Sequence, residues 1–323
     1  MESATASAPG KLFLFGEHAV IHGTPSVVTA IDRRMTVTAA KRNDDQIILT
    51  APDRGMFNER ISLEPIKRTQ ESRFVSAAVG AFFGKTGQRS GLDISTKSEF
   101  SGLNSLGSSA AVTVATIKAL DTLFGTKLSQ RDIFDLGFKA HAQDVQGGRG
   151  SGFDIAAATY GGTLYYKKGG ELIDPIRCDN MPLKYFTIPG IKFDTATMIS
   201  AVGADKEKHK EVYEAVLSTV TVVIKQARSS IEAGDWHTVG RLMNINQSFL
   251  ESIGVSTIQA TRVIYAVRIA GAYGAKITGG GGDNVICLSP EHHEQNILMA
   301  AEKECGRHVP VKPGEPGCRA EQS

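Results

Sequence analysis

The chain has 323 residues, of which 41% are hydrophobic and 22% charged, an ordinary composition for one large or two modest globular domains. Its 36 Lys and Arg residues nearly balance 34 Asp and Glu residues, for a net charge of +2, so the charge indicates neither nucleic acid nor an anionic membrane as a partner. No signal peptide or membrane-spanning run is expected. The four cysteines form no close C-x-x-C pair, which argues against a zinc site and favours reduced, cytoplasmic thiols.

Strand and helix patterns alternate along the chain and predict an α+β fold. Strands are expected at 5–15, 25–30, 35–40, 46–50, 92–96 and 284–288, and helices at 74–83, 110–123, 129–145, 206–233, 236–253 and 258–273. Residues 51–72 are expected to be irregular, and the Pro/Gly-rich tail from Pro310 is expected to fray. A polar stretch with two prolines at 170–185 predicts a boundary between domains at 1–180 and 181–323.

A Ser/Gly-rich segment leads directly into the Ala-rich helix at residue 110. Backbone N–H groups at a helix N-terminus attract anions, and glycine lets a phosphate approach the backbone closely. The hydroxyls of Ser108 and Ser109 could meet phosphate oxygens or a magnesium ion. No Lys follows in the Walker A frame. From this segment alone, a serine cap on an ordinary helix is an equally good interpretation.

Two further glycine-rich loops carry candidate chemistry. The loop at 147–152 ends just before Asp154, whose carboxylate could accept a proton from a substrate hydroxyl, although most such residues only cap a helix. Arg149 in that loop is a candidate clamp for phosphate or carboxylate, or a solvated loop residue. Four consecutive glycines at 279–282 are costly in chain entropy and favour close approach to another group. Lys11, in the first strand, matters only if these loops converge on it.

Three ordered motifs resemble those of the GHMP kinases. They are residues 8–20 (APGKLFLFGEHAV), 106–112 (LGSSAAV) and 276–282 (KITGGGG). Within that superfamily, residues 16–23 and 240–250 resemble mevalonate kinases, the latter segment those of archaea. Residues 146–158 (QGGRGSGFDIAAA) instead resemble phosphomevalonate kinases, so the chain mixes two patterns of the mevalonate pathway.

The resemblance implies an N-terminal domain like ribosomal protein S5 domain 2, a ferredoxin-like C-terminal domain, and an active site between them. It also implies ATP and Mg²⁺ as cofactors and Asp154 and Lys11 as the catalytic pair. It further implies which residues bind ATP, the acceptor and the metal ion. ATP would be bound by Ser105, Leu106, Gly107, Ser108, Ser109 and Ala110, the acceptor by Glu17, His18, Arg149, Ser151, Gly279 and Gly280, and Mg²⁺ by Ser108, Ser109 and Asp144. Asp144 stands near the place where mevalonate kinases have a magnesium-binding glutamate.

The implied function is an ATP-dependent kinase that phosphorylates the 5-hydroxyl of mevalonate, or of a phosphorylated mevalonate such as mevalonate 3-phosphate. Phosphomevalonate kinase activity and a non-catalytic, ligand-binding regulator are the alternatives. A regulator would be expected to lack the Asp or the Lys, and both are present. The partner is thus a small molecule in the cytoplasm, without nucleic acid or membrane. The assembly state stays open, with a homodimer among the options.

Overall fold

The computed structural model describes residues 2–64, 68–100, 106–148, 150–189, 195–280, 282 and 284–322. Its elements form two compact units, each assembled from segments that are distant in the sequence. The first unit contains residues 1–11, 30–162 and 315–323, and the second contains residues 12–29 and 163–314. The predicted boundary between domains near residue 180 stays a prediction. Each of the two units combines segments from both sides of that residue, so the units are not the two predicted domains.

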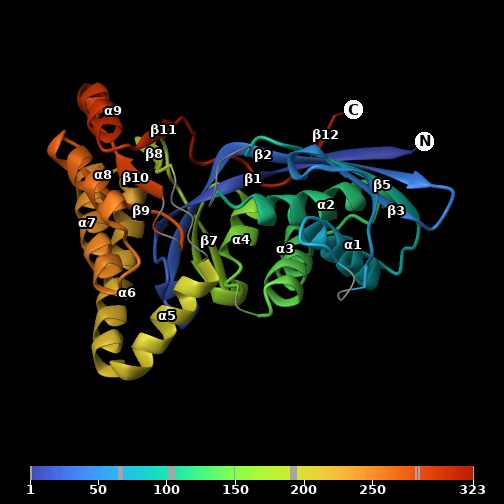
Figure 1. Ribbon diagram of the computed structural model, residues 1–323, viewed down its shortest axis with the longest axis horizontal. Coiled ribbons are helices and arrows are strands. Elements are labelled where there is room, and N and C mark those ends of the chain that lie inside the picture. The colour runs from blue at the N-terminus through green and yellow to red at the C-terminus, as the bar shows by residue number, and fades with distance from the viewer. Residues whose placement is uncertain are drawn as a thin grey trace. The chain divides into compact units, whose positions relative to one another are not determined.

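The first unit is a sheet covered by helices on one face (Figure 1). Its strand order is β12-β1-β2-β5-β3-β4, formed by β1 (Ser3–Phe15), β2 (Ser26–Arg42), β3 (Ile47–Ala51), β4 (Met56–Arg60), β5 (Gly91–Ser98) and β12 (Arg319–Glu321). The covering helices are α1 (Arg73–Thr86), α2 (Ser108–Phe124), α3 (Gln130–Phe138) and α4 (Phe153–Tyr160), and α3 continues into a π-helical turn, η4 (Lys139–Val145). The core between them combines small and aliphatic side chains with the buried rings of Phe82, Phe83 and Phe134.

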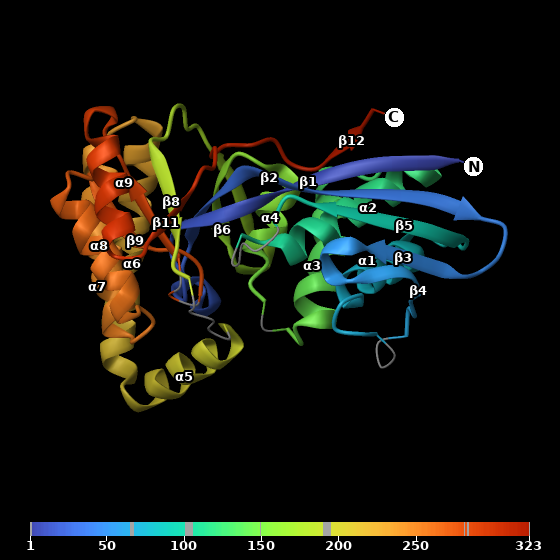
Figure 2. The same ribbon diagram turned by 45° about the horizontal axis from the view of Figure 1, so that its top comes forward.

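The second unit holds a four-stranded sheet with order β11-β8-β10-β9 (Figure 2). These strands are β8 (Leu183–Thr187), β9 (Gly274–Ile277), β10 (Asn284–Leu288) and β11 (Arg307–Val309). The accompanying helices are α5 (Thr195–Lys208), α6 (Lys210–Glu232), α7 (Trp236–Ser252), α8 (Ile258–Ile269) and α9 (Glu294–Lys303), and the short turns η1 (Ala19–His22) and η5 (Lys168–Gly170) also belong here. A hairpin of β6 (Thr163–Lys167) and β7 (Leu172–Ile176) pairs with Ser26–Thr29 of β2. The fold is therefore α+β, as predicted.

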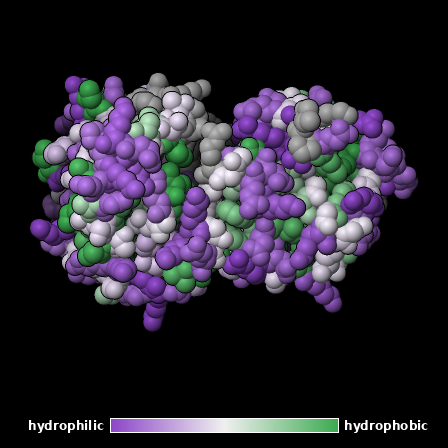
Figure 3. All heavy atoms as spheres, turned by 90° about the horizontal axis from the view of Figure 1, so that it is seen from below, coloured by the Kyte–Doolittle hydropathy of each residue, from purple (hydrophilic) through white to green (hydrophobic). Residues whose placement is uncertain are grey.

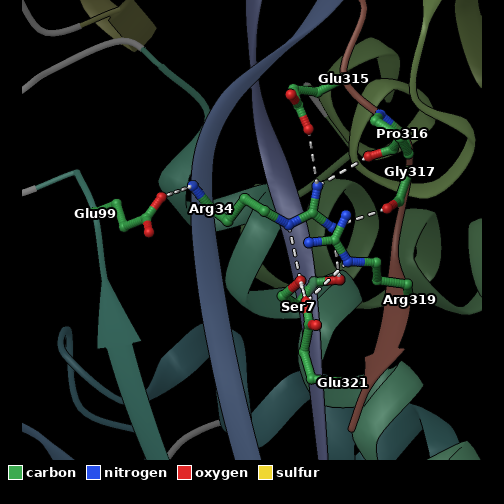
Figure 4. Close-up of polar contacts among 8 residues, drawn as sticks. All are labelled: Ser7, Arg34, Glu99, Glu315, Pro316, Gly317, Arg319 and Glu321. Carbon is green, nitrogen blue, oxygen red and sulfur yellow. Dashed lines mark hydrogen bonds and ion pairs between the residues drawn. The ribbon is translucent and has the colours of Figure 1, made fainter.

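The tail beyond Pro310 is ordered, and the expectation that it frays is wrong. Strand β12 pairs antiparallel with β1, and the buried guanidinium of Arg34 holds the chain just before it (Figure 4). This side chain donates to the carbonyls of Pro316 and Gly317 at 3.0 and 2.9 Å, and to the Ser7 hydroxyl at 2.8 Å. A planar group with five donors satisfies several carbonyls at once, which composition alone does not reveal.

Several boundaries also differ from the predicted ones. Residues 51–72 contain β4, the predicted strands at 25–30 and 35–40 are parts of one long strand, and α5 begins at Thr195, earlier than the predicted helix. The helix expected at 258–273 ends at Ile269 and gives way to β9, while α9 had no predicted counterpart. Packing, rather than local pattern, decides these short elements.

Hydrophilic side chains dominate the face drawn in Figure 3, where hydrophobic ones gather only in small groups. The large hydrophobic residues exposed in the described chain include Phe57 of β4, Val212 of α6, and Ile258, Tyr265 and Ile269, which all lie on α8. Single exposed apolar side chains are normal for a folded protein. Among the helices described, none is both long and apolar enough to span a membrane.

Candidate active site

The N-terminus of α2 and Lys11 meet in the first unit. Gly107 caps α2 with φ 82°, a left-handed conformation that suits glycine. A Cβ atom at this position would lie 3.0 Å from Cγ of Lys11, so the aliphatic stem of Lys11 crosses directly over the glycine. The backbone N–H of Lys11 donates to the carbonyl of Leu106 at 2.8 Å. Two of the predicted motifs, one in β1 and one before α2, are thus fastened together.

The first turn of α2 leaves backbone donors available for an anion. The first i→i−4 bond of the helix is the one from Ala111 to Gly107, so the N–H groups of Ser108, Ser109 and Ala110 precede it. No side chain caps this end of α2. Such groups, together with the helix dipole, attract phosphate. The geometry favours the phosphate-binding interpretation over the serine cap.

Asp154 lies in the first turn of α4, whose N-cap is Gly152. One carboxylate oxygen accepts from the backbone N–H of Ile155 at 3.0 Å, which fixes the orientation of the side chain. The preceding residue, Phe153, has its ring centroid 5.2 Å from Nζ of Lys11, within the range of a cation–π contact. Lys11 is therefore adjacent to the segment that carries Asp154, as the motif order predicted.

His141, in η4, joins the phosphate loop to Asp154. Its Nε2 lies 3.0 Å from Oγ of Ser109 and 3.9 Å from Oδ2 of Asp154. The imidazole is buried and stacks on Phe74 with centroids 4.9 Å apart. Burial lowers its pKa, and Asp154 opposes that shift. The sequence had suggested an ordinary structural histidine here, so this residue was missed; its only signal was its place thirteen residues before Asp154 in a helix that leads to the glycine loop.

The second unit contains the other two predicted groups of residues. Glu17 follows the turn at Gly16 and forms a fully buried ion pair with Lys276 of β9. Lys276 also donates to the carbonyl of Ile277 at 2.7 Å, and burial lowers its pKa while Glu17 opposes that shift. Each of these two buried charges is thus stabilised by the other. The carboxylate of Glu17 is engaged by this lysine, and its predicted contact with an acceptor stays a prediction.

Polar side chains of α7 hold the same region in place. Asn246 accepts from the backbone N–H of Gly16 at 3.3 Å, and Gln247 accepts from that of Ile277 at 2.9 Å. These bonds satisfy backbone groups at the end of β1 and in β9. The amide side chains of the segment 240–250, which resembles mevalonate kinases in sequence, therefore have a structural role.

His18 connects the first motif with the four-glycine loop. Its Nε2 lies 3.1 Å from the carbonyl oxygen of Gly280, and its backbone has φ 57°, a strained value for a residue other than glycine. Burial lowers its pKa, and the bond to Gly280 opposes that shift. Gly279, in the same loop, has φ 82°. This strained, buried imidazole is typical of a functional position.

The oxygen atoms near Ser109 fit a magnesium ion, and the predicted part of Asp144 in holding that ion stays a prediction. Mg²⁺ prefers oxygen ligands and commonly uses one or two carboxylates together with substrate phosphates. Ser109 and Asp154, which adjoin the same imidazole nitrogen, supply such oxygens. Asp144 instead lines a cavity of about 350 Å³ with Arg68, Arg89 and Lys139. In the part of the chain that is described, no cluster of three or more His, Cys, Asp or Glu side chains could hold a metal by itself.

Two predicted residues, Ser105 and Arg149, lie outside the described residues. The remaining predictions fall into two groups, one in each unit. In the first unit are Lys11, Leu106, Gly107, Ser108, Ser109, Ala110, Asp144, Ser151 and Asp154, and in the second are Glu17, His18, Gly279 and Gly280. Ser151 is buried directly before the N-cap of α4.

Comparisons with known proteins identify the family of the chain. The family model described as GHMP kinases N terminal domain matches residues 73–162, and the one described as GHMP kinases C terminal matches 227–307. A mevalonate kinase of Thermococcus sibiricus is 33% identical, over 98% of each chain. The crystal structure of the Methanococcus jannaschii mevalonate kinase is 25% identical with a TM-score of 0.78, over 98% of each chain.

A third relative shares the fold alone. The Lin0012 protein of Listeria innocua has a TM-score of 0.88 at 22% identity, over 99% of this chain and 100% of that one. The chain therefore belongs to the GHMP kinases, and it is a small-molecule phosphotransferase. Within that family, its relatives at more than 30% identity include mevalonate kinases of Thermococcus sibiricus and Pyrococcus horikoshii, which confirms the predicted resemblance to the mevalonate-pathway branch.

Proposed function

We propose that the protein transfers the γ-phosphoryl group of ATP to the 5-hydroxyl of mevalonate, or of a phosphorylated mevalonate such as mevalonate 3-phosphate. The observation that carries this proposal is the convergence of three separate segments in the first unit. Lys11 is hydrogen-bonded through its backbone to Leu106, and its ammonium lies over the ring that precedes Asp154. A phosphate loop, a cation and a carboxylate are the parts that phosphoryl transfer needs.

In the proposed reaction, positioning and charge neutralisation do most of the work. The first-turn N–H groups of α2 hold the phosphates of ATP. Lys11 stabilises the negative charge that develops on the acceptor oxygen and the transferred group. Asp154 orients the acceptor hydroxyl and takes up its proton as the oxygen–phosphorus bond forms. His141 keeps the Ser109 side chain in place through their hydrogen bond.

Ser109 and Asp154 are the residues that would hold Mg²⁺ in this proposal. When bound with the nucleotide, the ion neutralises charge on the phosphate oxygens. Ser108, at the start of α2 and half-buried, is the second hydroxyl predicted for this role.

The proposal is tested by product analysis with a panel of acceptors. Purified protein with ATP and Mg²⁺ is incubated with mevalonate, mevalonate 3-phosphate or mevalonate 5-phosphate, ADP release is followed by a coupled assay, and the position of the new phosphate is found by phosphorus NMR. A new 5-phosphate on either of the first two compounds supports the proposal. A 5-diphosphate formed only from mevalonate 5-phosphate would make the protein a phosphomevalonate kinase, and no ADP release with any acceptor would favour the regulator.

Arg149→Ala separates the two acceptor classes. If the acceptor bears a phosphate that this guanidinium clamps, the variant raises the KM for the phosphorylated acceptor roughly tenfold or more. The KM for plain mevalonate should change little. Equal effects on both acceptors would remove the argument for a phosphorylated one.

A further inference from the structure

The first unit contains a cavity of about 350 Å³ whose lining comes from α1, from the segments on either side of α1, and from η4. Figures 1 and 2 both draw α1 beside α3, the helix that continues into η4. Three of the lining side chains are cations, Arg68, Arg89 and Lys139, and Asp144 is an anion. A cavity of this size suits a small organic molecule better than a single ion.

The guanidinium of Arg68 has unused hydrogen-bond donors at this cavity. Its Nη2 donates to the carbonyl of Leu63 at 3.0 Å, which is the one hydrogen bond that the group makes within the described chain. Its Nε is buried and has no partner among the residues described. Burial lowers the pKa of Arg68, and the negative charge of Asp144 opposes that shift. Buried polar groups normally find a partner, so the unused donors indicate a place for an acceptor from outside the chain.

Positive charge exceeds negative charge around the cavity. Three cationic side chains face one carboxylate, which leaves two positive charges uncompensated. Arg89 is held against α1, because its guanidinium lies 5.7 Å from the ring centroid of Phe83. Lys139 is exposed at the start of η4. A phosphate monoester, with a charge of roughly −1.5 to −2 at neutral pH, matches this excess.

Two glycines of α1 keep one side of the cavity open. Gly80 and Gly84 are four residues apart, so they lie on the same side of the helix. A Cβ atom at Gly84 would meet no atom within 4 Å, so backbone crowding does not require glycine there. Glycine is unfavourable inside a helix relative to alanine. Phe83 and Leu63 add apolar surface to the lining, which suits a ligand that carries an apolar part.

We propose that this cavity binds a small organic phosphate, with its phosphate group among Arg68, Arg89 and Lys139 and its apolar part against α1. A phosphate is favoured over a carboxylate because its charge is closer to the excess, and because a planar guanidinium can meet two of its oxygens at once. Asp144 carries charge of the same sign as the ligand and therefore limits its affinity. Apart from Asp144, the lining residues differ from those proposed for ATP, acceptor and Mg²⁺, so this site does not depend on the proposed reaction.

Calorimetric titration with phenyl phosphate tests the site. The protein is first saturated with ADP and Mg²⁺, so that the proposed phosphate loop is occupied. Phenyl phosphate should then bind at one site per chain. It should bind more tightly than inorganic phosphate, which lacks the apolar part, and more tightly than phenol, which lacks the charge. Absence of binding to the saturated protein would overturn the inference, as would equal affinities for phenyl phosphate and phenol.

Charge variants locate the bound phosphate. Arg68→Met should raise the Kd for phenyl phosphate roughly tenfold or more, the scale of a hydrogen bond to a charged group. Arg131→Met removes an exposed arginine of α3 that pairs with Asp135, and it should change the Kd less than about twofold. Asp144→Asn should lower the Kd roughly twofold to fivefold, because a like charge is removed. An unchanged Kd in Arg68→Met, or weaker binding in Asp144→Asn, would contradict the assignment.

Gly84→Leu tests the site without any change in charge, and it decides the matter if Arg68→Met does not fold. The added side chain has open space at its Cβ and fills part of the cavity, while leucine favours the helix more than glycine does. Binding of phenyl phosphate should weaken at least tenfold, with the midpoint of urea denaturation unchanged or higher. Gly203→Leu is the matched control, because Gly203 lies in α5 and its Cβ would also meet no atom within 4 Å. Equal binding in the two glycine variants would place the ligand outside this cavity.

Discussion

The imidazole of His141 touches two residues that stand far apart in the sequence, Ser109 and Asp154. Linear motifs pointed to both of these partners, because the proposed phosphate loop and the proposed catalytic carboxylate each lie beside a local pattern of glycines. A lone histidine in a helical pattern carries none. Its position arises from the π-helical turn η4, which shifts the register of the helix that α3 begins. The turn packs against α1, and the shift in register is not visible in the residue spacing.

Replacing either predicted catalytic residue should abolish most turnover without unfolding the protein. Asp154→Asn and Lys11→Met are each expected to lower kcat roughly 10²-fold or more, the scale of general acid–base and electrostatic catalysis. Steady-state kinetics measure this, and circular dichroism confirms the fold. Full activity in both variants would remove these residues from the mechanism.

His141→Phe should act more weakly and on kcat rather than on the acceptor KM. The aromatic ring can keep the stacking on Phe74, but Ser109 loses its partner. One lost hydrogen bond corresponds to a roughly fivefold change in kcat. A variant with unchanged kcat would show that the imidazole serves packing alone, and thermal melting checks that the ring is accommodated.

At the scale of elements, periodic patterns located most long helices and the strands beside the motifs. Helices α2 and α7 match their predicted ranges closely, because each carries a clear start and a long apolar face. Strands β4, β7 and β8 lie in stretches whose polar residues and prolines hid the strand pattern, whereas the equally short β3 and β10 carry β-branched residues and were predicted. Strand β12 depends on partners hundreds of residues away. The sequence patterns therefore predicted the long helices better than the short elements that lie between them.

Arg34→Met should loosen the C-terminal segment. Removing the guanidinium leaves the carbonyls of Pro316 and Gly317 without their donor, which should lower the free energy of unfolding by about 2 kcal/mol or more. Hydrogen exchange should quicken most in residues 315–322. Arg60→Met, at an exposed position of β4, is the control. Equal exchange in both variants would show that β12 is held by its pairing with β1 alone.

Lys276→Met should destabilise the second unit strongly. The substitution leaves the carboxylate of Glu17 buried without its cation, a change that typically costs about 3–5 kcal/mol. Chemical denaturation measures the effect. The double variant Glu17→Gln with Lys276→Met should recover part of the loss because no uncompensated charge remains. Arg131→Met, which breaks an exposed pair with Asp135, should change stability little, and a similar loss there would contradict the argument from burial.

For the whole molecule, buried imidazoles should make stability depend on pH. Burial lowers the pKa of His18, His22, His141 and His308 in the folded state. Above about pH 6.5, the ordinary histidine pKa, these imidazoles are neutral in both the folded and the unfolded state, so they do not lower the free energy of unfolding. Below it the unfolded chain takes up protons that the folded chain does not, so the free energy of unfolding falls, by at most about 1.4 kcal/mol per pH unit for each imidazole.

Urea denaturation at pH 7.5 and pH 5.5 measures this dependence. The midpoint should be lower at pH 5.5, and His308→Phe should reduce the difference by removing one of the four groups. A midpoint that is the same at both pH values, or higher at pH 5.5, would contradict the prediction.

The C-terminal segment 315–322, which Arg34 holds, also sets an order of events during synthesis. Residues 315–322 complete the first unit, yet all of residues 163–314 must be translated before them. At 5–20 residues per second this interval is on the order of ten seconds. During that time one edge of β1 is unpaired and the guanidinium of Arg34 lacks its carbonyl partners. The nascent chain on the ribosome is therefore open to β-strand addition by other chains, and a chaperone that covers this edge would be most useful before the final strand emerges.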